Sequence, residues 1–450
     1  MKHRMHAFSA ASLLAAFSVF STTGAFAQAT YDRAPILPVS YEVDENEFDP
    51  SETWIKFENV IRLKYAYNDR GEIDLNHQLA RSRELAYAAK DLSELRSVLR
   101  ATVFALLDPH LVINPYSRGD YGYKNGDLVM AFVDGLPTVL DVRRGSPAEA
   151  FGLRPNDIIR EVDGEPAEIA ALRPFGQVLP NATPRHRDYG LTLAANGQAG
   201  RKRHFVVARN DADQLVELPS VGEYAESLAD RDPVMLDFVA EDSSIAHIVI
   251  QDALGDNDLI EAFDRIMADA ANARAIILDL RETPSGGNTE VARSIIGHFI
   301  SETRPYQMHR VPVLEREFGV PRQFVEYVTP RLPHYAGQIV VLHGRWTGSM
   351  GEGLVIGMDA ATNAVTIGSD MANLLGAIWT EELDDDGTTF HYAGESLFHV
   401  NGTPREDFVA DIMVDPAGVA PDGRDQALER AIELLSGLDL QTIERTKGIE

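Results

Sequence analysis

The sequence contains no cysteine, only seven lysines among 450 residues, and no long hydrophobic run beyond its first residues. The absence of cysteine excludes a disulfide framework, a thiol nucleophile and a thiolate metal site. No lysine lies between Lys202 and Lys447, so that stretch cannot supply a catalytic amine. A lysine base would have to come from a distant end of the chain.

Basic residues are scarce in general. The 69 acidic residues outnumber the 41 Lys and Arg residues, and the formal net charge is −28. Such a surface repels phosphate backbones and anionic lipids, so we expect neither a nucleic acid nor a membrane surface as a partner. Apolar residues, at 44%, are ordinary for a globular protein with a sizeable core.

The first 27 residues have the composition of a cleavable secretory signal. Lys2 and Arg4 form a short basic start, an apolar stretch follows, and Ala25 and Ala27 are the small residues that a signal peptidase accepts. The alternative is a membrane anchor, but Ser and Thr interrupt the stretch, whereas a spanning helix needs ~20 predominantly apolar residues. We therefore expect a periplasmic or secreted protein with no integral membrane segment after cleavage.

The rest of the chain is long enough for about three domains of ~150 residues. We expect a lead-in and a helical cap over residues 28–117, because apolar residues recur there at helical spacing. Residues 118–218 are predicted to form a β-rich domain, since short strand-like runs surround glycine-containing turns. In residues 230–440, apolar strands alternate with helices, which is typical of a sheet buried on both faces.

Ser349 is the first candidate for a chemical role. An apolar strand over residues 339–342 ends, Gly344 and Gly348 turn the chain, and a helix begins near the serine. This arrangement exposes a hydroxyl at the positive end of a helix dipole, where backbone N–H groups can stabilise an oxyanion. The ordinary use of a serine at this position is as an N-cap, so the segment alone leaves both roles open.

Three other segments carry candidate groups. A strand over residues 275–280 leads to a turn with Gly286 and Gly287, where backbone amides could come close to a substrate carbonyl. A turn that needs positive φ would use glycines equally well. His110 follows the helical cap and Glu406 lies in a loop near the end of the chain, and each taken singly has a structural or solvated role as its ordinary interpretation.

Taken together and in this order, the segments resemble the tail-specific, or C-terminal processing, serine peptidases and their tricorn-like relatives. The resemblance covers most of the mature chain. The matching segments are residues 145–150, 152–159 and 162–164 for a PDZ domain, 279–281 with Gly286 and Gly287 for the core strand and its turn, 347–352 with Ser349 and Glu352 for the nucleophile, and 411–414 for the closing strand. The sequence departs from the family pattern at Phe151, Asn156, Glu282, Thr283 and Ala410.

The resemblance implies an α/β protein with an N-terminal helical cap, a PDZ-like β-rich domain and a crotonase/Clp-like ββα sheet domain that carries catalysis. It implies Ser349 as the nucleophile, with the oxyanion held by the Met350 amide and an amide of Gly286 or Gly287. One branch of the family activates the serine with a lysine in a turn after the next strand. The corresponding turn here, residues 368–376, contains no lysine.

The tricorn-like branch uses a histidine from outside the sheet domain, and residues 106–110 match the segment that contains it. The resemblance therefore implies His110 as the base and Glu406 as the group that orients the relay, through a hydroxyl that the sequence does not identify. His343 is the main alternative base, because it ends a strand six residues before Ser349 and could reach the start of the neighbouring helix.

The remaining polar residues suggest no metal or cofactor chemistry. No His-Glu-x-x-His or comparable cluster occurs, so we expect no catalytic metal and no cofactor. His298 lies on the apolar face of a helix predicted over residues 289–300, and we interpret it as a packed structural residue.

These observations predict a secreted serine endopeptidase that forms an acyl-enzyme on Ser349. Its PDZ-like domain would dock protein or peptide substrates by adding a strand to its sheet. One alternative is a catalytically inactive, PDZ-containing peptide-binding protein on the same scaffold, which the changes at Glu282 and Thr283 and the missing lysine would explain. A crotonase-like lyase or isomerase is a further alternative, but its anionic coenzyme does not suit an acidic chain. Nothing in the sequence indicates the oligomeric state.

Overall fold

Helices form the N-terminal part of the described chain, as predicted. The computed structural model describes residues 48–438 except positions 72, 123–125, 210–211, 229–230, 241, 285 and 416–423, so the expected signal at residues 1–27 lies outside it. The first elements are α1 (Ser51–Asn59), η1 (Val60–Lys64), α2 (Leu75–Tyr87) and α3 (Leu92–Ala105). Asp74 and Asp91 begin α2 and α3, because their carboxylates accept the backbone N–H groups of His77 and Glu94.

The next sheet has the strand order β2-β3-β4-β6-β7, with β5 paired to β4. Its strands are β2 (Leu128–Val133), β3 (Leu136–Val142), β4 (Ile158–Val162), β5 (Glu165–Pro166), β6 (Arg203–Arg209) and β7 (Ala212–Leu218). The accompanying helices are α4 (Pro147–Ala150), α5 (Ala167–Ala170), η2 (Arg173–Phe175) and α6 (Pro184–Asn196), and α7 (Val221–Leu228) follows. Helix α6 packs against the edge strand β2, and its Leu191 and Ala194 share a core with Leu128 and Met130.

A six-stranded sheet with the order β17-β14-β13-β10-β9-β8 forms the main C-terminal layer, and its strands are parallel except for β8. The strands are β8 (Val234–Val239), β9 (Ile245–Gln251), β10 (Ala275–Glu282), β13 (Gln338–His343), β14 (Val365–Gly368) and β17 (Ile412–Met413). The helices are α8 (Asp258–Asp269), α9 (Thr289–Gly297), α11 (Met350–Ala361) and α12 (Gln426–Glu433), with η3 (Arg405–Asp407) and η5 (Leu434–Leu438).

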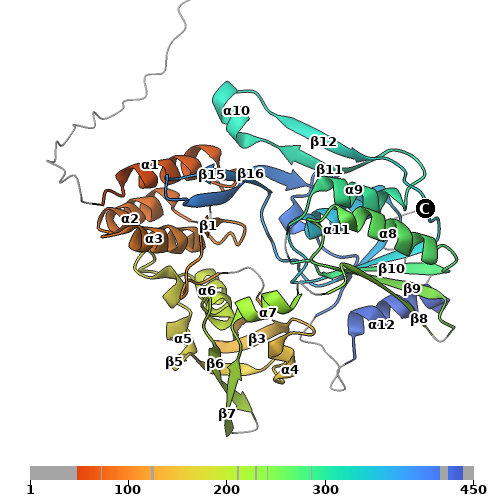
Figure 1. Cartoon of the computed structure of the whole chain (residues 1–450), viewed down its shortest axis with the longest axis horizontal. Helices are drawn as coiled ribbons and strands as arrows, with labels where there is room; N and C mark the ends of the chain where they lie inside the picture. The colour runs from red at the N-terminus through yellow and green to blue at the C-terminus, as the bar shows by residue number, and fades with distance from the viewer. Residues whose placement is uncertain are drawn as a thin grey trace, which may run out of the picture. The chain divides into compact units, whose positions relative to one another are not determined.

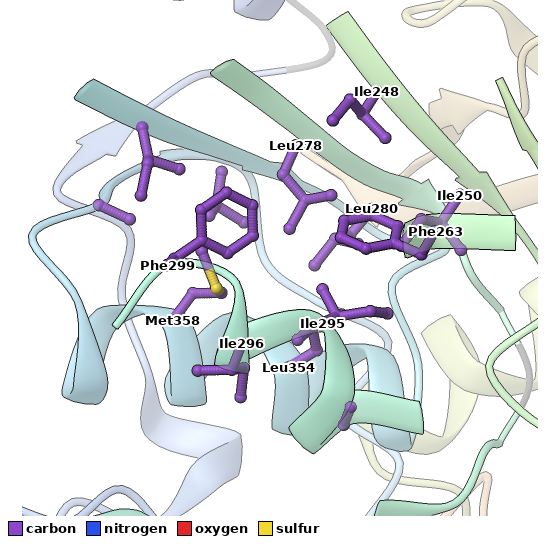
Figure 2. Packing of buried hydrophobic residues seen from close by; sticks show 14 of the residues in the cluster. Ile248, Ile250, Phe263, Leu278, Leu280, Ile295, Ile296, Phe299, Leu354 and Met358 are labelled. Carbon is purple, nitrogen blue, oxygen red and sulfur yellow. The ribbon is translucent and has the colours of Figure 1, made fainter. Parts of the chain in front are cut away.

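Both faces of this sheet are buried, which explains its nearly continuous apolar strands. Helices α8, α9 and α11 cover one face, and Figure 2 shows Leu278 and Leu280 of β10 beside Phe263, Ile295 and Leu354 of these helices. Helix α12 packs its own apolar side chains against the other face. In the described part of the chain, no helix combines the length and the apolar character that a bilayer crossing requires.

A third sheet, which the sequence analysis did not anticipate, joins segments that are far apart along the chain. Its order is β1-β16-β11-β12, and β15 also pairs with β16. Its elements are β1 (Val112–Asn114), β11 (Arg304–Arg310), β12 (Gln323–Val328), β15 (Ala377–Glu382) and β16 (Thr389–Phe398), with α10 (Pro312–Phe318) between β11 and β12. Strand β1 follows the helical cap and pairs with β16, so it fixes the segment after the cap to the C-terminal part of the chain (Figure 1).

Helix α9 is shorter than expected. It ends at Gly297, whereas the apolar periodicity predicted a helix to residue 300. The Gly297 carbonyl accepts the N–H of Arg331 (2.8 Å), and the His298 carbonyl accepts the N–H of Tyr335 (2.8 Å). A neighbouring segment therefore uses the carbonyls at the helix end, and the apolar pattern alone could not reveal this.

Candidate active site

Ser349 lies at the sharp turn between strand β13 and helix α11. Its backbone has φ 52° and ψ −110°, a conformation that a residue with a side chain rarely adopts. The Ser349 N–H donates a hydrogen bond to Oε2 of Glu352 (2.8 Å), one turn along the helix. Backbone strain of this kind is concentrated at functional sites, and a strained strand-to-helix turn is a known way to expose a nucleophilic serine.

The glycine turn after β10 runs alongside the Ser349 turn. Thr283 and Thr347 form a parallel β-bridge, and the Gly348 N–H donates to the Thr283 carbonyl oxygen (2.9 Å). A Cβ atom placed on Gly286 would lie 3.3 Å from the Ser349 hydroxyl oxygen. The absence of a side chain at this position therefore allows the backbone of the turn to border the hydroxyl.

The other two residues expected at the oxyanion site have different surroundings. Met350 is the first residue of α11, where backbone N–H groups have no acceptor within the helix. At Gly287 a Cβ atom would lie only 2.2 Å from the Leu254 carbonyl oxygen, so close packing requires this glycine. Gly286 is thus the glycine of the turn that borders Ser349.

His110 lies in the turn between α3 and β1. The carboxylate of Asp108 accepts the His110 backbone N–H (2.9 Å) and the Tyr65 hydroxyl (2.8 Å), and it fixes the turn. Asp108 is almost completely buried, and burial raises its pKa to about 6. The Nδ1 atom of the His110 ring lies 2.7 Å from the Leu375 carbonyl oxygen.

This last contact determines the tautomer of His110. A carbonyl oxygen can only accept a hydrogen bond, so Nδ1 of the ring carries the proton and donates it. In the neutral ring Nε2 is then left as a proton acceptor. Burial lowers the pKa of His110 to about 3, and the ring is therefore neutral at neutral pH, as a general base must be.

A cavity of about 570 Å³ brings the His110 segment and the Gly286 turn together. Both residues line it, together with Trp346 and Leu374. The hydrogen bonds of the described residues do not include one between His110 and Ser349. The structure therefore places His110 at the same cavity as Gly286, the residue that borders Ser349. Catalytic hydrogen bonds are often formed only in the presence of substrate.

Glu406 lies in the short helix η3, and the hydrogen bonds of the described residues include none between it and His110. Its Oε2 atom is buried and, among the described residues, has no hydrogen-bond partner, and burial raises the pKa of this carboxyl. The Leu375 carbonyl, rather than Glu406, holds the His110 ring in the structure.

Arg405, which the sequence analysis did not single out, is the buried neighbour of Glu406. Its guanidinium donates to the carbonyl oxygens of Ser349 (3.1 Å) and Gly376 (3.2 Å) and also to that of Leu374. One side chain thus fixes both the Ser349 turn and the loop whose Leu375 carbonyl contacts the His110 ring. A loop arginine beside two acidic residues has the sequence signature of a solvated residue, so only its burial reveals this role.

Glu352 connects the same two segments from the other side. Besides the Ser349 N–H, its Oε2 atom accepts the Leu374 N–H (3.1 Å), and Arg405 lies 3.6 Å away. Burial raises the pKa of Glu352 to about 7. The sequence analysis matched this glutamate to the family pattern but assigned it no role.

The two other histidines considered in the sequence analysis, His343 and His298, do not line the cavity that contains His110. His343 is buried at the end of β13 and lines a second cavity of about 540 Å³, together with Arg281 and Asp425. His298 is buried as predicted, where Nδ1 donates to the Pro333 carbonyl (2.7 Å) and Nε2 lies 3.0 Å from an Asp264 carboxylate oxygen. Within the described residues, no group of three or more histidine or acidic side chains is arranged to hold a metal ion.

Two segments of the chain match models of known protein families. Residues 244–422 match the model of peptidase family S41, and residues 138–173 match the model of a PDZ domain. No curated protein matches the chain. These matches confirm the family resemblance and the fold class drawn from the sequence.

Solved structures share the fold. The photosystem II D1 C-terminal processing protease has a TM-score of 0.54 at 15% identity, over 87% of this chain and 98% of that one. Mature CPAF complexed with lactacystin has a TM-score of 0.57 at 14% identity, over 88% of this chain and 99% of that one.

Proposed function

We propose that this chain is a secreted serine endopeptidase that acts through an acyl-enzyme on Ser349. The match of residues 244–422 to peptidase family S41 and of residues 138–173 to a PDZ domain supports the proposal. The observation that carries the proposal is the strained backbone of Ser349, whose hydroxyl borders the Gly286 turn. The composition of the first 27 residues supports export to the periplasm or the exterior.

In the proposed reaction Nε2 of His110 takes the proton of the Ser349 hydroxyl as the oxygen attacks the peptide carbonyl carbon. The Met350 amide and an amide of Gly286 or Gly287 stabilise the oxyanion. The imidazolium then gives its proton to the departing amine, the C–N bond breaks, and an ester on Ser349 remains. A water molecule, deprotonated by the same imidazole, hydrolyses the ester.

His110 suits this role because its ring is fixed and neutral. The Leu375 carbonyl sets the tautomer that leaves Nε2 as the acceptor, and burial keeps the resting ring uncharged. We propose that Glu406 stabilises the imidazolium through an intervening hydroxyl. Its Oε2 is buried close to Arg405 and accepts no hydrogen bond from any residue that the structure describes.

The shape of the cavity supports protein or peptide substrates and a role of the PDZ domain in docking them. Besides His110 and Gly286, Leu128 of β2 and Thr192 of α6 line the cavity. A chain that lies against the PDZ-containing sheet would therefore reach Gly286, the residue that borders Ser349, along one continuous space. The size, about 570 Å³, is that of a site for a few residues of an extended peptide.

A fluorophosphonate probe tests the nucleophile, because an activated serine displaces fluoride from phosphorus and keeps the phosphonate. We expect mass spectrometry to locate the adduct on Ser349, and S349A to remain unlabelled. H110Q should label roughly 10²–10⁴-fold more slowly, the usual range for loss of a general base. H343Q is the matched control and should label at the wild-type rate.

Two results would contradict the proposal. Labelling that persists in S349A would place the nucleophile elsewhere. A wild-type protein that neither reacts with the probe nor cleaves an unfolded protein substrate would favour the inactive peptide-binding protein.

A further inference from the structure

Strand β2 is an edge of the PDZ-containing sheet, and among the strands that the structure describes it pairs only with β3. A peptide that docks by strand addition needs the free N–H and C=O groups of such an edge. In an antiparallel pair, alternate residues direct these groups away from the partner strand. The hydrogen bonds made by Leu128, Met130 and Phe132 of β2 therefore decide whether this edge is open.

All three residues are already hydrogen-bonded by side chains of helix α6. Asn196 accepts the Leu128 N–H (3.2 Å) through Oδ1 and donates to the Leu128 carbonyl (2.9 Å) through Nδ2. The Thr192 hydroxyl accepts the Met130 N–H (3.0 Å) and donates to the Met130 carbonyl (2.9 Å). These contacts reproduce the donor and acceptor pattern of a paired strand.

The ladder continues at Asp188, whose Oδ1 accepts the Phe132 N–H (2.8 Å). Its regularity follows from helix and strand geometry. Four helical residues rise ~6.0 Å, and two strand residues rise ~6.6 Å, so helix positions 188, 192 and 196 stay in step with strand positions 132, 130 and 128. Thr192 and Asn196 are buried, so water does not compete for these hydrogen bonds.

Helix α6 is also fixed on its other sides. A Cβ atom on Gly190 would lie 2.0 Å from the Ala171 carbonyl oxygen, so the helix approaches the α5 segment as closely as a backbone can. Nε2 of His186 lies 3.0 Å from the carbonyl oxygen of Ala105, the last residue of α3. The helix therefore cannot leave β2 without breaking contacts to its neighbours.

We propose that α6 is a built-in occupant of the strand-addition edge, and that Asp188, Thr192 and Asn196 compete with an incoming peptide for the backbone of β2. The inference rests on the proposed docking function and refines it. A peptide tail pairs with β2 only to the extent that it displaces this ladder. The ladder therefore sets a threshold that weakly strand-forming tails do not pass.

Substitution of ladder residues tests the competition. The probe is a fluorescein-labelled octapeptide rich in Val and Thr with a free carboxylate, and fluorescence anisotropy is measured in the S349A background to prevent cleavage. T192V keeps the shape of the side chain but frees the N–H and C=O of Met130. We expect about tenfold tighter binding than in S349A alone, because the peptide then satisfies two otherwise unpaired groups.

The controls separate strand addition from other effects. T138V removes a hydroxyl that donates to the Leu136 carbonyl (2.9 Å) within β3, and it should leave the affinity unchanged. A peptide N-methylated at alternate residues cannot donate to the strand and should gain nothing from T192V. D188A removes a single, partly exposed contact, and it serves as the second variant, with a gain of about threefold, should T192V fail to fold.

Equal affinity of S349A, its T192V form and its D188A form would overturn the proposal. A second result would also overturn it. If the peptide binds S349A but leaves the hydrogen exchange of the Leu128, Met130 and Phe132 amides unchanged, the peptide binds elsewhere. Neither result depends on catalysis. Probe labelling of Ser349 tests the peptidase function separately, so failure of one proposal can be told from failure of the other.

Discussion

Ser349 holds a backbone conformation that glycine adopts freely and residues with a side chain adopt rarely. Such a conformation costs of order 1–3 kcal/mol. Alanine at this position removes the hydroxyl but keeps the strain, whereas glycine removes both. We therefore expect S349G to be more stable than S349A by about 1 kcal/mol, with neither variant able to form an acyl-enzyme. Urea denaturation measures the difference, and equal stabilities would mean that the turn is unstrained.

Glu352 allows a second test at the scale of single residues. Its Oε2 accepts the N–H groups of Ser349 and Leu374, so a neutral acceptor should preserve the turn where a truncated side chain does not. We expect E352Q to keep kcat/KM within a few-fold of wild type and E352A to lose at least about tenfold, since two buried N–H groups lose their acceptor. Equal losses in the two variants would show that the negative charge, not the hydrogen bonding, is required.

The raised pKa of Glu352 also predicts how stability depends on pH. The folded carboxyl holds its proton up to about pH 7, whereas the unfolded one releases it near 4.5. Between these values the folded state binds more protons, so this group makes the protein less stable as the pH rises. The stability of E352Q relative to wild type should therefore increase from pH 5 to pH 8, as measured by the midpoint of thermal unfolding.

The sequence could identify the groups with distinctive chemistry but not those that position them. Ser349 and His110 lie in segments that match the family pattern. Because the turn at residues 368–376 has no lysine, a histidine was expected as the base. Arg405 acts through backbone carbonyls of Ser349, Leu374 and Gly376, which have no sequence signature. Its role depends on burial, and burial of a loop residue is decided by the tertiary fold.

At the scale of elements, the turns after β10 and before α11 must lie side by side. A Cβ atom on Gly348 would lie 2.7 Å from the Pro284 carbonyl oxygen, a backbone atom that can move only with its turn. We expect G348A to push the 283–287 turn away from Ser349 and to lower kcat/KM by about tenfold or more, because small misplacements of catalytic groups have large kinetic effects.

G357A in the same helix provides the control for G348A. A Cβ atom there would meet side-chain atoms of Ile296 and Tyr306 at 2.8 and 2.9 Å, far along α11 from the active-site turn. We expect it to lower the melting temperature while kcat/KM stays close to wild type. A loss of activity in G357A as large as that in G348A would show that helix stability, rather than turn geometry, controls catalysis.

Elements with strong periodicity were predictable, and elements defined by distant partners were not. The strands β9, β10 and β13 could be predicted because most of their residues are apolar and buried. Strand β1 has only three residues and pairs with β16, far along the chain, so no local pattern reveals it. Helix α6 was not predicted because the polar residues Asp188, Thr192 and Asn196 also contact β2 and interrupt the apolar stripe of the helix.

At the scale of the whole molecule, a few polar contacts link the PDZ-containing sheet to the peptidase domain. Trp346, in the loop before Ser349, donates from Nε1 to the Gly126 carbonyl (2.8 Å), just before β2. Arg143, which follows β3, donates from Nε to the carboxylate of Glu282 (2.8 Å) at the end of β10. Both contacts connect residues beside the candidate active site to the PDZ-containing part of the chain.

The Arg143–Glu282 pair predicts a pH-dependent link between the two parts. The Arg143 side chain is 1% exposed, and burial already raises the pKa of Glu282 although Arg143 opposes the shift. In R143M the carboxylate loses its cation, so its pKa rises further and ionisation destabilises the folded state. Removing one partner of a buried pair typically costs about 3–5 kcal/mol.

Proton linkage gives the direction in which the destabilisation of R143M changes with pH. Above the ordinary glutamate pKa the unfolded carboxyl is ionised, whereas the folded R143M protein must hold the proton or bury a charge, so the loss of stability grows as the pH rises. We expect urea unfolding to show a larger destabilisation of R143M at pH 8 than at pH 5. The double variant R143M/E282Q should recover most of the loss at pH 8, because no charge remains to be buried. The same loss at both pH values would mean that Arg143 acts through packing, for instance against the Tyr224 ring 5.4 Å away, and not through its charge.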